Sequence, residues 1–417
     1  MLPKGWKKEA VRDRGEVQAG RQRAPSFTQG KSTKYLRVAN VYDGRIDTSD
    51  VLEMPFSDAE KQRYLLHDGD ILLNEGQSLE LVGRPAVYTG NPPDCCFQNT
   101  LIRFRANPGV SPEYALQRFR LCMYDGTFQA IASKTTSIAH LGVSRFSSLE
   151  LEWPPAEEQE KIVQILTIWN DAVAAAEQQL AIAIRLKKGL SQSLFSENHR
   201  IRNGNEKLKN VRASQIFFPS SVKNSGGLQL LSVMQDAGVV PRSGLGRKVV
   251  MPKGSTEGYK RVDSGDFVIS LRSFEGGLEY SRHLGLVSPA YTVLKSKKKI
   301  VDDFYRHYFK SHDFIGRLAV AVIGIRDGKQ ISYEDFAFLK IPSPPLDEQR
   351  KIADVLNHAE ALIANYRKYL ERLRIEKQAL MQQLLTGKRR VKMPAAAKPP
   401  LAKPKPTKPK TVKDRRK

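Results

Sequence analysis

Two segments of the chain place apolar side chains at alternating steps of four and three residues. They cover residues 154–196 and 344–386, and nine of ten positions on this seam are apolar in each segment. The tenth position is a lysine at the same step in both, Lys187 and Lys377. This spacing predicts two helices of about 40 residues, each about 60 Å long, that pair along a coiled-coil seam.

The seam also predicts which side chains the helices bury against each other or against a docked subunit. These interface candidates are Ile162, Leu166, Trp169, Leu180, Ile352, Leu356, Ile363, Leu370 and Leu373. The two seam lysines would extend their ammonium groups to water, set the register or contact a docked subunit. The alternative is that each helix is amphipathic and packs separately on its own domain.

The two helices belong to a longer internal repeat. One constant shift along the chain brings the prolines at 154–155 onto those at 344–345, and it brings Glu158 and Gln159 onto Glu348 and Gln349. The match continues through the helices and upstream of them, where Phe146 falls on Phe336. The chain is therefore interpreted as two copies of one unit, a segment of about 150 residues followed by a helix.

The segment that precedes each helix has the pattern of strands and turns. Short apolar runs such as 71–73, 101–104 and 267–271 are separated by Gly, Pro, Asn and Asp. We therefore predict an α+β fold with two globular domains, joined by two long antiparallel helices and related by a pseudo-two-fold repeat. The predicted boundaries are 1–153 and 197–343 for the globular domains, 154–196 and 344–386 for the helices, and 387–417 for a tail.

The charge of the chain indicates what kind of partner it binds. The chain has 68 Lys and Arg against 44 Asp and Glu, a net charge of +24. Half of that excess lies in the Pro-rich and Lys-rich tail, which we expect to be disordered and either to solubilise the chain or to tether it to DNA. Duplex DNA has a backbone dyad. A basic chain that consists of two copies of one unit therefore suggests a protein that recognises two separated half-sites.

Other classes of protein are disfavoured by the same sequence. The longest apolar stretch, 318–325, is far shorter than the ~18 to 20 residues that span a bilayer, and the N-terminus carries charges where a signal peptide would be apolar. We expect a cytoplasmic protein without a membrane partner. Cys95, Cys96 and Cys122 give neither a disulfide framework nor zinc-ligand spacing, so we expect reduced, buried thiols.

The ends of the two helices carry a family resemblance. The second helix begins with PPLDEQRKIA (344–353) and ends with LMQQLLTGKR (380–389), the first begins with the weaker PPAEEQEKI (154–162), and GLVSPAY (285–291) adds to the match. In these motifs and in Leu2, Pro3, Gly5 and Trp6, the chain resembles the specificity subunit of type I restriction-modification enzymes over residues 1 to about 390. Ala156 and Gly189 replace Leu346 and Ala379 in the first copy, which suggests a locally softer first helix.

The resemblance implies two target-recognition domains that each read one half of a bipartite site in double-stranded DNA. It implies that the helices hold these domains apart and dock modification subunits. It also implies that the chain is not catalytic. In such complexes the modification subunits bind S-adenosylmethionine and methylate adenine, and a separate restriction subunit, a motor and nuclease, uses ATP.

The sequence contains only incomplete versions of known catalytic motifs. The Asn-Pro-Pro-Asp at 91–94 lacks the aromatic with which adenine methyltransferases hold their base, and Pro25 stands where a phosphate loop ending at 30–32 needs glycine. The histidines show no metal-ligand spacing. We therefore assign no catalytic, cofactor-binding or metal residue. An autonomous methyltransferase is disfavoured, and the remaining alternative is a coiled-coil scaffold whose globular ends bind other proteins.

DNA contacts require polar or basic side chains on exposed loops, because these reach phosphates and base edges. The candidates in the first domain are Lys31, Lys34, Arg84, Lys134, Thr135 and Thr136. Those in the second domain are Arg272, Ser273, Arg282, Arg326, Lys329 and Gln330. For any one of them, the alternative is a solvated surface side chain.

Overall fold

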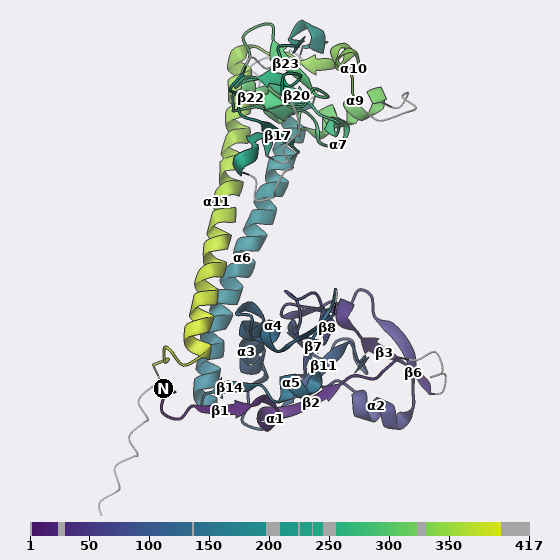
Figure 1. Cartoon of the computed structure of the whole chain (residues 1–417), viewed down its shortest axis with the longest axis vertical. Coiled ribbons are helices and arrows are strands. Elements are labelled where there is room, and N and C mark those ends of the chain that lie inside the picture. Colours follow the sequence, from purple (N-terminus) through teal and green to yellow (C-terminus); the bar gives the residue numbers. More distant parts are fainter. Residues whose placement is uncertain are drawn as a thin grey trace, which may run out of the picture. The chain divides into compact units, whose positions relative to one another are not determined.

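A computed structural model describes residues 2–23, 30–135, 137–196, 209–223, 226–235, 237–244, 256–322 and 331–392. The chain divides into two compact units. Unit 1 consists of Met1–Val173 with Arg372–Lys417, and unit 2 consists of Ala174–Glu371. Each unit contains one globular α+β domain and a part of each long helix (Figure 1). The units thus divide the helices, whereas the sequence-based boundaries follow the helix ends.

The domain of unit 1 is built from short strands in five small sheets. Its largest sheet has the order β2-β11-β7-β9, and the others are β10-β3-β6, β12-β13-β8, β1-β14 and β4-β5. The strands are β1 (Lys7–Ala10), β2 (Gly15–Ala19), β3 (Lys31–Leu36), β4 (Val41–Tyr42), β5 (Arg45–Ile46), β6 (Leu52–Phe56), β7 (Ile71–Asn74), β8 (Gly76–Gln77), β9 (Pro85–Val87), β10 (Cys96–Phe97), β11 (Leu101–Ala106), β12 (Ser133–Lys134), β13 (Ala139–His140) and β14 (Glu150–Trp153). The helices are α1 (Val11–Arg14), η1 (Val38–Asn40), α2 (Asp58–Tyr64), α3 (Pro112–Tyr124), α4 (Thr127–Ile131), α5 (Val143–Ser147) and the long α6 (Ala156–Phe195).

The main core of unit 1 joins residues from both ends of the chain. Phe104, Phe119 and Phe146 pack edge to face at its centre, between the sheet and α3. The same core includes Ile162 and Leu166 from the start of α6 and Met381, Leu384 and Leu385 from the end of α11 (Leu346–Leu385). Because the beginning of one helix packs with the end of the other, the two helices are antiparallel in this unit.

Unit 2 repeats the plan, with fewer strands among its described residues. Its sheets have the orders β16-β23-β20-β21, β15-β24, β17-β18 and β19-β22. The strands are β15 (Asn210–Arg212), β16 (Phe217–Ser220), β17 (Leu231–Met234), β18 (Gly238–Pro241), β19 (Lys260–Val262), β20 (Phe267–Ile269), β21 (Glu279–Tyr280), β22 (Gly285–Val287), β23 (Thr292–Ser296) and β24 (Lys340–Pro342). The helices are η2 (Ala213–Gln215), η3 (Arg242–Gly244), α7 (Ser273–Gly276), α8 (Asp302–Tyr308), α9 (His312–Val322), α10 (Tyr333–Phe338) and α11.

The core of unit 2 is rich in aromatic rings, and the long helices close it from one side. Phe217, Phe267 and Phe309 pack within 5.1 to 5.6 Å of one another between ring centroids. Leu194 and Phe195 from the end of α6 join Ile352 and Leu356 from the start of α11 in this core. The helices are therefore antiparallel here as well, which confirms the predicted fold class.

The internal repeat recurs in the hydrogen bonds. Gln159 donates from Nε2 to Pro154 O at 2.9 Å and accepts from Ser111 N at 2.9 Å. Gln349 donates to Pro344 O at 2.8 Å and accepts from Val301 N at 2.9 Å, so each partner in the first copy has its counterpart at the same shift in the second. The glutamine of each Pro-Pro-x-x-Glu-Gln motif thus fastens the start of a long helix to its own domain.

The interface candidates on the helices are shielded to different degrees. Seven are buried: Ile162, Leu166, Ile352, Leu356, Ile363, Leu370 and Leu373. Trp169 and Leu180 are only partly buried. Cys95, Cys96 and Cys122 are free and buried, as expected, and burial raises the pKa of each thiol to about 12. Among the described residues, no helix is long and apolar enough to cross a membrane.

Candidate nucleic-acid interface

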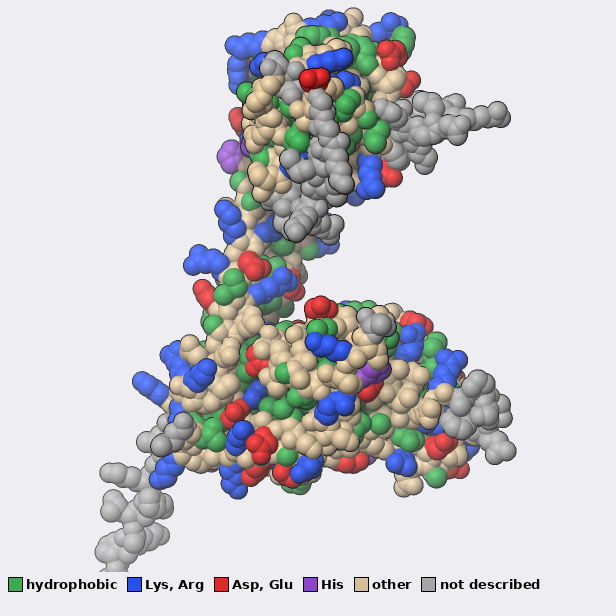
Figure 2. Space-filling view, viewed as in Figure 1, with side chains coloured by type: hydrophobic (Ala, Val, Ile, Leu, Met, Phe, Trp, Pro, Cys, Tyr) green, Lys and Arg blue, Asp and Glu red, His purple; other side chains and the backbone are tan. Residues whose placement is uncertain are grey.

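Basic side chains do not gather in a single patch on the face drawn in Figure 2. Lys and Arg alternate there with Asp and Glu over both units. The contacts of each basic residue therefore indicate whether it is available to DNA, because many Lys and Arg side chains already have an acidic neighbour. Lys31 on β3, for example, lies 3.6 Å from Asp58, while its exposed neighbour Lys34 makes no ion pair with the described residues.

A β-hairpin presents two of the predicted residues of the first domain. Lys134 lies on β12 and Thr135 follows it, and both are exposed. The hairpin is rigid, because Thr135 Oγ1 donates to Ile138 O at 2.9 Å and Arg145 Nη2 donates to Ser133 Oγ at 3.0 Å. Thr136 lies outside the described residues.

Arg84 stands beside two residues that the sequence analysis missed. Its guanidinium lies 4.8 Å from the ring centroid of Tyr42, and the guanidinium of Arg45 lies 4.9 Å from the same centroid. Tyr42 and Arg45 flank the turn between β4 and β5. The Asp-Gly dipeptide at 43–44, a common hairpin signal, would have located this turn but not the arginine that meets it.

The candidates of the second domain differ in exposure. Arg272 is exposed at the start of α7, and Arg282 is exposed with its guanidinium 5.7 Å from the ring of Tyr280. Ser273 is only 1% exposed, and its Oγ accepts a hydrogen bond from Ser270 N at 2.8 Å. Its prediction as a DNA contact is wrong in this structure, because the hydroxyl closes a turn. Arg326, Lys329, Gln330 and the tail from 393 onward lie outside the described residues.

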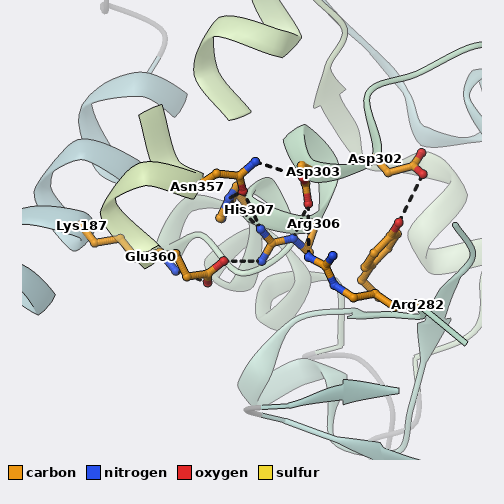
Figure 3. Close-up of polar contacts among 9 residues, drawn as sticks. Lys187, Arg282, Asp302, Asp303, Arg306, His307, Asn357 and Glu360 are labelled. Atoms are coloured by element: carbon orange, nitrogen blue, oxygen red, sulfur yellow. Dashed lines mark hydrogen bonds and ion pairs between the residues drawn. The ribbon is translucent and has the colours of Figure 1, made fainter. Parts of the chain in front are cut away.

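An ionic network joins the second domain to the long helices (Figure 3). Arg306 of α8 donates to Asp303 at 2.6 Å, to Asn357 at 2.7 Å and to Glu360 at 2.7 Å. Lys187 of α6 reaches the other carboxylate oxygen of Glu360 at 2.6 Å. Glu360 therefore links α8, α6 and α11, and the seam lysine Lys187 has an ion-pair partner.

This network shifts the protonation of two of its members. Burial lowers the pKa of His307 to about 4, with the nearby Arg306 acting in the same direction. Burial acts to raise the pKa of Glu360, but hydrogen bonds and charges from Lys187 and Arg306 outweigh it and hold this pKa at about 2. At neutral pH the imidazole is neutral and the carboxylate is ionised.

Two clefts of about 770 and 420 Å³ border the network within unit 2. Both are lined by Lys187, Lys310 and Glu360. Lys188 and Arg367 line only the larger of these two, and neither makes an ion pair with the described residues. The clefts therefore offer more positive than negative charge, which suits an anionic group.

In unit 1 a buried carboxylate connects three distant parts of the chain. Glu158 at the start of α6 is 2% exposed and accepts from Trp6 Nε1 at 3.1 Å. Arg390, beyond the end of α11, binds the same carboxylate at 2.7 and 3.2 Å. Gly387 packs between these groups with a positive φ of 70°, and a Cβ there would lie 2.9 Å from Pro3. The residues at 387–390, predicted as the start of the tail, thus contact the domain.

Among the residues described, no three His, Cys, Asp or Glu side chains come together in a way that could hold a metal ion. Asp94 of the Asn-Pro-Pro-Asp segment pairs with Lys61 at 3.1 Å, and Tyr88 donates to Pro92 O. These contacts stabilise a turn.

Comparisons with known proteins indicate the kind of subunit to which this arrangement belongs. Residues 3–185 match the model of the type I restriction modification DNA specificity domain. A Methanocaldococcus jannaschii protein named as a type I restriction enzyme MjaX specificity subunit is 27% identical over 421 residues, which cover 94% of this chain and 95% of that protein. The MjaVIII specificity subunit of the same organism is 27% identical over 298 residues, 64% of this chain and 68% of that protein.

A solved structure supports the fold at the level of the whole chain. A chain from a study of complex assembly and conformational transition in the type I restriction-modification system aligns with a TM-score of 0.64 and 18% identity. The alignment covers 93% of this chain and 99% of that one.

Proposed function

Because the chain belongs to the family of type I restriction-modification specificity subunits, we propose that each of its globular domains reads one half of a bipartite site in double-stranded DNA. The observation that carries this proposal is the duplication of the anchoring contacts. Gln159 and Gln349 each fasten a long helix to a domain by the same two hydrogen bonds. A duplex offers two equivalent approaches about its dyad, and a duplicated protein matches them.

The long helices have two proposed roles. They set the separation and rotation of the two half-sites, because each is a continuous helix of 40 residues that begins in one unit and ends in the other. They also dock modification subunits. Exposed apolar side chains, which a partner would remove from water, support this role. They are Ile168, Ile182, Ile184, Leu186, Leu362, Tyr369 and Ile375.

The chemistry is proposed to lie on other subunits of the complex. We propose that this chain binds neither S-adenosylmethionine nor ATP. The modification subunits would bind the first and methylate adenine, and the restriction subunit would use the second. The complex would work in the cytoplasm, where its DNA lies.

Selection from a DNA library tests the division into half-sites. The chain is purified with its modification subunits, and bound duplexes are selected at fixed salt from a pool with random half-sites and random spacer length. Replacing residues 1–153 by the same segment of a relative should change one selected half-site and leave the other unchanged. A change in both halves would contradict the modular division. If the parent complex selects no bipartite site, the scaffold alternative replaces the proposal.

The same library tests the role of the helices. Inserting one heptad after Ala181, with a matching heptad in α11, keeps the seam in phase and adds about 10 Å of helix, close to three base pairs. The preferred spacer should lengthen while both half-sites stay the same. An unchanged spacer would show that the helices do not set this distance.

A further inference from the structure

Arg84 is an exception among the shielded arginines of the first domain. Five others have a carboxylate partner at 2.7 to 2.8 Å: Arg21 with Glu60, Arg103 with Glu16, Arg105 with Asp70, Arg118 with Glu152 and Arg120 with Asp43. Arg84 makes no ion pair with the described residues, and its buried Nε has no hydrogen-bond partner there. Burial also lowers the pKa of this guanidinium. Tyr42 and Asp43 act to raise this pKa, but a partly buried guanidinium without an ion pair is still costly, which requires an explanation.

The surroundings of Arg84 are open on one side and positively charged. Its guanidinium lies against Tyr42, which is 39% exposed, and the exposed Arg45 meets the same ring. Asp43, the acidic residue of this hairpin, is already bound by two nitrogens of Arg120 at 2.7 and 3.0 Å. The carboxylate that acts on Arg84, Asp43, is therefore already engaged by Arg120, whereas the charge of Arg45 acts on Asp47.

The backbone around this group is held in place before any ligand arrives. Gly44 N donates to Pro85 O at 2.9 Å, which pins the β4–β5 turn to the residue after Arg84. Asn74 N donates to Arg84 O at 3.1 Å. The preceding Gly83 has a φ of 73°, and a Cβ on it would lie 2.4 Å from the ring of Phe128. The backbone at Arg84 thus has little freedom, so the backbone loses little entropy when a ligand binds.

We propose that Arg84, supported by Tyr42, reads a guanine in the half-site bound by the first domain, while Arg45 contacts a neighbouring phosphate. This inference rests on the proposed function and specifies it. A guanidinium has only donors, in a planar fork, and the major-groove edge of guanine presents two adjacent acceptors, O6 and N7, in the matching geometry. A fixed, shielded arginine suits a base edge, whereas an exposed one suits the backbone.

Arg84→Ala and Arg84→Lys test the proposal in the complex with modification subunits. Arg63 provides the matched control, because it is an exposed arginine that also meets a tyrosine, 5.5 Å from the ring of Tyr64, on the same domain. Arg84→Ala should weaken binding to the parent site by about 10- to 100-fold and remove the preference for guanine at one position of one half-site. Arg84→Lys should not restore it, because an ammonium lacks the fork. Arg63→Ala should change neither quantity.

Other outcomes have defined meanings. A loss of affinity that is equal for all sequences, with the salt slope reduced by about 0.9, would make Arg84 a phosphate contact and overturn base reading. Unchanged binding would make it a surface residue and overturn the proposal as well. Thermal unfolding separates a structural role, since removing an unpaired guanidinium should not lower the melting temperature. If the parent complex itself selects no site, the proposed function has failed rather than this assignment.

Discussion

The two domains meet the long helices at equivalent places with different chemistry. In unit 2 the junction is ionic, with Arg306 at its centre and Asp303, Glu360 and Lys187 around it. The equivalent positions of the repeat in unit 1 hold Leu116 for Arg306, Gln117 for His307 and Asn170 for Glu360. Leu116 and Gln117 are buried there, and the buried Gln117 Oε1 and Asn170 Oδ1 accept no hydrogen bond from the described residues.

The comparison shows that one backbone arrangement can be stabilised in two ways. Unit 1 relies on apolar packing at this junction, and its ion pair at the buried Glu158 lies elsewhere in the unit. Unit 2 relies on charges whose partners come from three helices. Ionic junctions are sensitive to pH, whereas apolar junctions are not. The second domain should therefore be the more easily uncoupled of the two.

The largest loss of stability is expected when Arg306, the central charge of the unit 2 junction, is replaced by leucine, the residue at the equivalent position in unit 1. Arg306→Leu leaves Asp303 and Glu360 shielded without their main cation, and it should lower the free energy of unfolding by about 3 to 4 kcal/mol. Urea denaturation, together with hydrogen exchange in α8, measures this loss of unfolding free energy. The double variant Arg306→Leu with Glu360→Asn removes both charges and should recover more than half of the loss. No recovery would mean that size, and not charge, holds the junction.

Acid should weaken unit 2 in a defined window. The pKa of His307 is about 4 when folded and about 6.5 when unfolded, so between these values the unfolded chain binds a proton that the folded chain does not. The free energy of unfolding should therefore fall by about 2 to 3 kcal/mol as the pH falls from 6.5 to 4. The loss continues below about pH 4.5, where the unfolded form of Glu360 is protonated first.

His307→Gln, which introduces the residue of the first copy, isolates this effect. Stability of the variant should change less between pH 6.5 and 4 than that of the parent, so the difference between the two curves should shift by about 2 to 3 kcal/mol in favour of the variant over this range. Arg306, Lys187, Asn357 and Glu360 surround position 307 in the parent, and they are unchanged in the variant. Parallel curves would show that another group titrates.

The buried carboxylate of Glu158 in unit 1 should contribute more to the free energy of unfolding than its counterpart in unit 2, Glu348. Glu158→Gln keeps one acceptor for Trp6 but removes the charge that binds Arg390, which should cost about 1 to 2 kcal/mol of unfolding free energy. Glu348→Gln is the matched control, because this side chain is only partly buried. Thermal unfolding compares the two variants. Equal losses would show that the terminal contact adds nothing at Glu158.

The smallest effect concerns the first helix. A Cβ at Gly189 would meet no heavy atom within 4 Å among the described residues, so Gly189→Ala should stabilise α6 by up to about 1 kcal/mol. The mirror variant Ala379→Gly, on exposed α11, should lose a similar amount. Denaturation midpoints provide the comparison. A destabilised Gly189→Ala would show that this glycine serves a docked partner or a bend.

Local spacing in the sequence was sufficient for the helices but not for the junctions. The seam and the Pro-Pro-x-x-Glu-Gln motifs predict α6 and α11 because their determinants lie within a few residues of one another. Arg306 and Glu360 lie far apart in the sequence and belong to no periodic pattern, so their pairing follows only from tertiary packing. Tyr42 and Arg84 came together for the same reason, and Ser273 looked exposed because no local signal reveals its turn.

The contact of Arg390 with Glu158 has a consequence for the order in which the protein can be built. Unit 2 is one contiguous segment, residues 174–371, and all of it is synthesised before residue 390. Unit 1 contains the first residues to emerge, yet Met381, Leu384 and Leu385 belong to its core and Arg390 closes it. Domains usually complete in the order of synthesis. Here the domain whose synthesis begins first is therefore the last to be completed.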